Sequence, residues 1–93
     1  MMTFLFGKRQ SERIQLAVDF AAWIGAATLI SQTVTATRDD QDVTETFISS
    51  SDIAESRVTF WTEPAEAGIY LVTVQTTDSE GSVWEQRVQV TVK

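Results

Sequence analysis

Strict alternation of apolar and polar residues is the feature that most constrains how this chain folds. From residue 12 to residue 20 the apolar side chains fall at every second position, so Ile14, Leu16 and Val18 share one face of an extended strand. No helical stripe is longer than one or two turns. The pattern therefore predicts an all-β chain. The same period of two marks later segments at 30–37, 43–49, 58–62, 69–77 and 82–92.

These segments differ in the place within a sheet that each one predicts. Residues 69–77 carry apolar side chains on both faces, which predicts a central strand. Residues 43–49 alternate with neither face clearly apolar, which predicts an edge strand, and 49–52 after them are expected to form a loop. The turn at 78–81 ends in Gly81, whose tolerance of a left-handed backbone predicts a tight hairpin.

A chain of 93 residues holds one hydrophobic core. The spacing of Glu66, Gly68 and Tyr70 is typical of the corner at which an immunoglobulin-like domain enters its penultimate strand, where the tyrosine hydroxyl bonds backbone upstream. A plain core tyrosine is the alternative. The predicted fold is an immunoglobulin-like antiparallel β-sandwich of about six to seven strands over 12–93, preceded by an N-terminal arm or linker over 1–11. A small barrel is the alternative architecture.

The composition argues against catalysis. The chain has no Cys and no His, which removes disulfides, thiol nucleophiles, the usual zinc sites and the commonest proton-transfer group near neutral pH. Asp39, Asp40 and Asp42 resemble calcium ligands, but a loop counted from Asp40 places Glu45 where glycine is needed and Ser51 where glutamate is needed. We therefore expect a solvated turn there, no metal, no cofactor, no small-molecule substrate and no enzyme activity.

Charge and hydropathy narrow the choice of partner. A net charge of −6 repels phosphate backbones and anionic lipid, so neither nucleic acid nor membrane is expected. No stretch approaches the roughly 18–20 apolar residues of a membrane span. The apolar start is too short for a signal peptide, and its basic residues Lys8 and Arg9 follow the apolar run. We expect synthesis without an export signal, and protein partners remain.

The N-terminal arm is the first candidate partner-binding segment. Phe4, Leu5 and Phe6 have no periodic counterpart in the sandwich, and Lys8 and Arg9 belong to what is expected to be a flexible, basic linker. Such a segment either folds back on its own core or joins a neighbouring subunit as an inserted or added strand. The intermolecular version is the favoured expectation.

Trp61 is the second candidate. Its strand buries Val58 and Phe60 on one face, so alternation points the indole outward with Thr59 and Glu63. An outward tryptophan buries a large apolar area only when a partner or a flanking loop covers it, and both remain open. The other two tryptophans, at 23 and 84, are expected in the core or at its edge.

Five segments follow one another in a characteristic order along the chain. They are LAVDF with Trp23-Ile24, VTFW at 58–61, AGIYLVTV at 67–74, TTDSEG at 76–81 and VQVTV at 88–92. Their order and spacing resemble a family of small immunoglobulin-like proteins of tailed bacteriophages, often called fibre-to-tail adaptors. The resemblance covers about residues 8–93. The chain departs from the family pattern at Glu63-Pro64, where a pair of glycines generally follows the tryptophan-containing strand.

The resemblance implies a non-enzymatic part of the virion, made in the host cytoplasm and present in several copies around the tail axis. Its partners would then be neck, tail or fibre proteins of the virion and copies of itself. The alternative is an adhesion or capsid-decoration domain that binds through the exposed loops at 39–42 and 49–52. A carbohydrate-binding domain and an acidic mimic of DNA fit less well, because only Trp61 is an available aromatic platform and the acids gather in turns.

Overall fold

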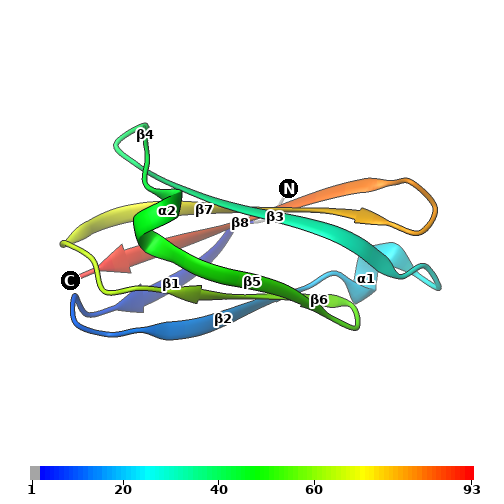
Figure 1. Ribbon diagram of the computed structural model, residues 1–93, viewed down its shortest axis with the longest axis horizontal. Coiled ribbons are helices and arrows are strands. Elements are labelled where there is room, and N and C mark those ends of the chain that lie inside the picture. Colours follow the sequence, from blue (N-terminus) through cyan, green and yellow to red (C-terminus); the bar gives the residue numbers. More distant parts are fainter. Residues whose placement is uncertain (1–2) are drawn as a thin grey trace.

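The structure, a computed structural model, describes residues 3–93 and places two β-sheets face to face (Figure 1). Its strands are β1 (Thr3–Lys8), β2 (Ile14–Asp19), β3 (Leu29–Arg38), β4 (Gln41–Asp42), β5 (Ile48–Ala54), β6 (Arg57–Thr62), β7 (Gly68–Asp78) and β8 (Val83–Val92), with two helical turns, α1 (Ala21–Ile24) and α2 (Thr44–Phe47). Within residues 3–93, no helix is long and apolar enough to cross a membrane.

The larger sheet has the strand order β1-β8-β7-β3-β4, and the smaller one has the order β2-β6-β5. Strand β7 lies between β8 and β3 and is antiparallel to both, as expected for a central strand. Strand β1 runs parallel to β8, which makes it the exception in an otherwise antiparallel structure. The prediction of an all-β sandwich is confirmed.

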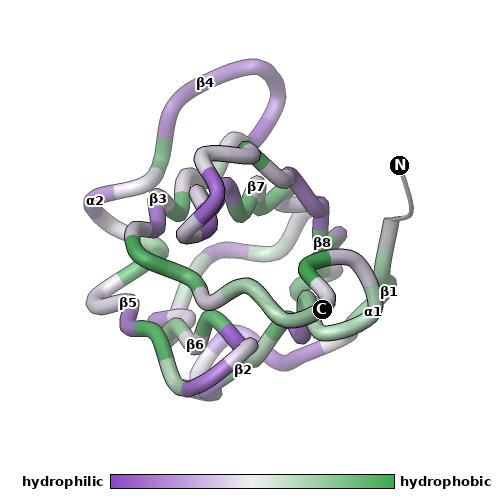
Figure 2. Tube along the Cα trace, turned by 90° about the vertical axis from the view of Figure 1, so that its right-hand side faces the viewer, coloured by the Kyte–Doolittle hydropathy of each residue, from purple (hydrophilic) through white to green (hydrophobic). Residues whose placement is uncertain are grey.

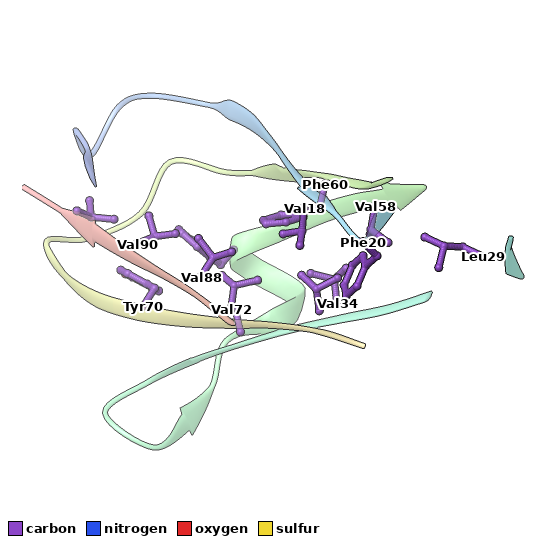
Figure 3. Close-up of a cluster of buried hydrophobic side chains, with 14 of the residues drawn as sticks. Val18, Phe20, Leu29, Val34, Val58, Phe60, Tyr70, Val72, Val88 and Val90 are labelled. Carbon is purple, nitrogen blue, oxygen red and sulfur yellow. The ribbon is translucent and has the colours of Figure 1, made fainter. Parts of the chain in front are cut away.

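The core lies between the inner faces of the two sheets (Figure 3). Alternation selects its members, since Val58 and Phe60 of β6 are fully buried and face Val72 and Val90 from the larger sheet. Each fully buried apolar side chain of this size contributes about 1.5–3 kcal/mol. The sandwich is thus held mainly by the inward positions that the period of two predicts.

Tyr70 closes one end of the core as its spacing predicts. Its hydroxyl donates to the backbone oxygen of Glu66 at 2.9 Å, and its ring stacks on Phe47 with centroids 4.3 Å apart. Glycine is favoured at position 68 because its φ of +155° is a backbone conformation that other residues rarely adopt, and an added Cβ would also lie 2.7 Å from Nε of the Arg38 side chain. That guanidinium in turn donates to the Ala67 oxygen at 2.9 Å.

The hairpin between β7 and β8 is organised by Asp78, whose side chain is buried. Its carboxylate accepts from the backbone N–H groups of Glu80 and Ser82 and from the indole N–H of Trp84 at 2.9 Å. The bond from Trp84 is the main reason why the pKa of Asp78 is lowered. Gly81 has φ +87°, which confirms the predicted left-handed residue.

The expected edge strand at 43–49 and the expected loop at 49–52 were wrong. Thr44–Phe47 forms α2, and β5 then runs from Ile48 to Ala54 through the three serines. The helical turn begins where Asp42 Oδ1 accepts the Thr44 N–H at 2.9 Å, and it rotates Phe47 into the core, where only 1% of the side chain is exposed. Burial of Phe47 against Tyr70 outweighs the weak strand pattern.

The free arm expected at the N-terminus was also wrong for the residues that the structure describes. Residues 3–8 form β1, which pairs continuously with β8 from Thr3↔Arg87 to Lys8↔Val92, so the sandwich does not start at residue 12. The linker is an ordered turn instead: the Ala65 N–H donates to the Gln10 oxygen at 3.0 Å. Residues 1 and 2 of the predicted arm lie outside the described range.

Candidate protein-binding surfaces

The first candidate surface is the free edge of β1. Phe4 and Phe6 share the inner face with the β8 valines opposite them, whereas Leu5 points outward. Phe6 packs against the core, but Phe4 is 38% exposed and Leu5 is 76% exposed. The fold thus fixes the predicted apolar triplet in a strand, covers Phe6 in part and leaves Phe4 and Leu5 exposed.

A groove of about 360 Å³ lies between β1 and β2. These strands are the outermost strands of different sheets, and Figure 2 shows β1 on the side of the molecule opposite β4 and α2. No residue from 3 to 7 or from 14 to 18 is charged. The groove is lined by Phe4, Leu5, Phe6, Leu16, Ala17, Val18, Asp19 and Val88. It is therefore an apolar groove bordered by two strand edges with unpaired backbone groups.

Lys8 was predicted to bind a partner, and the structure buries it. Its side chain is 3% exposed, and Nζ donates to the backbone oxygen of Glu63 at 2.8 Å and to Thr62 Oγ1 at 3.4 Å. The ammonium also lies 5.3 Å from the ring centre of Phe47. Burial lowers the pKa of Lys8, against the opposing effect of the nearby acids. Lys8 thus anchors the end of β1 to β6 and is not available to a partner.

Arg9, the other basic residue of the predicted linker, remains on the surface. Its backbone N–H donates to Glu12 Oε1 at 2.6 Å, and the Glu12 N–H donates back to the Arg9 oxygen at 3.2 Å. These bonds fix the turn between β1 and β2. Arg9 is therefore an exposed residue on an ordered turn between β1 and β2.

Trp61 points out of the smaller sheet, as predicted, because β6 buries its alternate residues. The guanidinium carbon of Arg13 lies 4.1 Å from the Trp61 ring centre, and Arg13 Nε donates to Glu63 Oε2 at 2.6 Å. Hydrogen bonds with Ser49 and Arg13 lower the pKa of Glu63. A planar cation over an indole is favourable and partly covers the ring. Trp61 is thus a half-buried surface residue and not a core residue.

Solved structures supply the comparison that decides the fold. Titin domain M7 superposes with a TM-score of 0.58 at 12% identity, covering 99% of this chain and 87% of that one. A titin Ig tandem gives 0.58 at 15% identity, covering 97% of this chain and 44% of that one. The fold is immunoglobulin-like. The M1 domain of titin agrees, with a TM-score of 0.55 at 9% identity over 98% of this chain and 90% of that one.

These likenesses concern the fold of the immunoglobulin-like sandwich alone. No protein-family profile matches the chain, and no curated protein sequence matches it. The specific partner has to be argued from the surfaces of this chain.

The acidic residues considered as metal ligands serve local turns. Asp39 and Asp40 have φ values of 52° and 62°, which two-residue hairpins of this kind require, and they connect β3 to β4. The hydrogen bonds that Asp42 accepts from Thr44 lower the pKa of its carboxyl. Within residues 3–93, no group of three or more metal-binding side chains comes together.

Two features of these surfaces escaped sequence reasoning. Lys8 has the same parity as Phe4 and Phe6, so its inward direction follows once residues 3–8 are recognised as a strand. Arg13 meets Trp61 across neighbouring strands, where Gln15 is paired with Trp61. Such a contact depends on the strand register, which the local pattern did not specify.

Proposed function

We propose that the chain is a non-enzymatic protein-binding module and, more specifically, an adaptor of a tailed-phage virion that joins neck, tail or fibre proteins. The observation that carries the binding role is the apolar groove between β1 and β2, where two free strand edges meet exposed Phe4 and Leu5. The assignment to a phage particle is supported by the sequence resemblance alone.

The surfaces suit passive binding. A partner strand placed along β1 or β2 would satisfy their free N–H and C=O groups, and alternate apolar side chains of that strand would enter the groove. Trp61 lies on the other face of the same smaller sheet, so a partner that covers β2 meets the Arg13–Trp61 pair next. Neither contact requires a chemical step.

The test is incorporation into particles of the phage that encodes the chain. Tagged wild-type protein is expected in purified virions, and the Leu5→Asp variant is expected to be depleted because it places a charge at the mouth of the groove. Ile30→Asp is the matched control, since Ile30 is 62% exposed on β3, away from the groove. Absence of the wild-type protein from virions contradicts the adaptor role.

The same experiment addresses the adhesion and capsid-decoration alternative. That role was expected to use exposed loops at 39–42 and 49–52. In the structure, residues 49–52 lie within strand β5. Normal incorporation of Leu5→Asp together with loss of incorporation when Asp39 and Asp40 are changed would favour the alternative. The adaptor role predicts the opposite result.

A further inference from the structure

We infer that β1 pairs with β1 of a second copy of this chain, antiparallel and about a two-fold axis at Leu5. The inference rests on the proposed binding role of the groove and names one partner for it. It starts from an asymmetry between the strand edges. Strand β1 pairs with β8 without a register shift and contains neither proline nor a charged residue before Lys8. Edge strands in natural proteins usually carry a bulge, a proline or a charged residue that prevents pairing with another chain.

The other edges are blocked or shortened. Strand β4 has two residues, and β5 has a register shift between Ile48 and Ser51. The side chain of Gln32 on β3 donates to the Ser51 oxygen at 3.3 Å, which occupies one backbone oxygen of β5. Strand β3 is uncharged from 29 to 37, but Ala36 on its outer edge already bonds the Thr44 hydroxyl and the Val43 N–H. Within residues 3–93, the edge of β1 therefore remains a regular edge of six residues with no charge before Lys8.

The sequence of β1 is self-complementary in one register. With Leu5 opposite Leu5 of the other copy, each Phe4 lies opposite a Phe6 on the groove face. Aromatic cross-strand pairs stabilise antiparallel strands. The four phenylalanines then extend the apolar lining that Leu16 and Val18 already provide.

Charge permits the same arrangement. Residues 3–19 and 83–93 carry five basic and three acidic residues, a net charge of +2, whereas the rest of the chain carries two basic and ten acidic ones, a net charge of −8. Two sides of +2 repel each other less than two acidic sides would, whereas a +2 side and an acidic side attract each other. The two-fold axis also brings the Gly7 end, near Arg9 and Lys93, towards the Phe4 end, where Asp19 lines the groove.

The interface is small, so the dimer is weak. Six residues of strand extend about 20 Å, and pairing along that length buries less than the roughly 1,600 Å² of a typical stable complex. We expect a monomer at micromolar concentration and a dimer as the concentration approaches millimolar. Sedimentation velocity over that range measures the equilibrium directly.

Leu5 gives a test specific for the two-fold axis, because it lies opposite itself. Leu5→Lys and Leu5→Glu should each weaken the dimer at least about tenfold, since like charges then face each other. An equimolar mixture of the two variants should dimerise again. Ile30→Lys is the control and should dimerise as the wild type does. All three variants should keep the wild-type melting temperature, because both side chains are exposed.

The outcomes separate the alternatives. A wild-type chain that stays monomeric near millimolar concentration overturns the inference, while incorporation into virions still decides the adaptor role separately. Oligomers larger than a dimer that dissociate when salt is added would show that the β1 and β2 side of one copy binds the acidic side of the next. That result also overturns the inference. A mixture of the Lys and Glu variants that does not associate excludes the two-fold register.

Discussion

The two lateral sides of the sandwich differ in how far their strand edges are covered. On one side, β3 and β5 lie close enough for Gln32 to reach the Ser51 backbone, and the nearby loop is acidic. On the other side, β1 and β2 leave an apolar groove, with Phe4 and Leu5 exposed. The two sides therefore differ in how much apolar strand edge they leave exposed, and the proposed binding role assigns the partner to the β1 and β2 side.

The largest expected effect is a difference in the loss of stability between two phenylalanines, Phe47 in the core and Phe4 at the groove. Phe47 is 1% exposed and stacks on Tyr70, so Phe47→Ala should lower the free energy of unfolding by about 3–5 kcal/mol. Phe4→Ala should cost about 1 kcal/mol, because Phe4 is already 38% exposed at the groove. Urea unfolding measures both. Equal losses would show that the groove is as tightly packed as the core.

Lys8 allows the groove side to be tested separately, because its side chain anchors β1 to the end of β6. Its pKa is lowered by burial, so the folded chain releases this proton more readily than the unfolded chain does. The penalty for the buried charge is fully present near neutral pH and disappears as the pH rises towards the ordinary lysine value of about 10.4. The free energy of unfolding should therefore rise with pH in that window.

Lys8→Met isolates this effect, because it keeps the aliphatic length and removes the titrating group. The difference in stability between wild type and Lys8→Met should shift in favour of the wild type as the pH rises through the alkaline window. Arg9→Met is the matched control at an exposed neighbour and should show no such trend. If the stability difference between the wild type and Lys8→Met does not change with pH, the Lys8 ammonium is solvated and does not anchor β1 to β6.

Local pattern predicted the parts of the fold whose burial alternates strongly. Strands β6, β7 and β8, the Tyr70 bond and the Gly81 turn follow from neighbouring residues. The helical turn α2 did not, because the run around Phe47 fits a strand as well as a helix until Tyr70 is in place beside it. Tertiary contacts decide such ambiguous segments.

The structure leaves Phe4 and Leu5 of the predicted site exposed and buries Lys8, and the shape of the groove was not predicted. The sequence indicated Phe4, Leu5 and Trp61 as interface residues, a role that the binding experiments above test. It did not reveal that β1 would pair with β8, because that parallel contact joins the two ends of the chain. The groove arises only when the outermost strands of two sheets are brought together, which no local window contains.

The smallest expected effect concerns the outer face of β6. Trp61→Ala should reduce stability by only about 1 kcal/mol, because the half-buried indole packs mainly under Arg13 and outside the core. Arg13→Ala should cost a similar amount, and the double variant less than their sum by about 0.5–1 kcal/mol, the coupling of a surface cation–π pair. Additive losses would show that the pair does not interact in solution. A loss of several kcal/mol for Trp61→Ala would place the indole in the core. The proposed binding surface would then consist of β1 and β2 without Trp61.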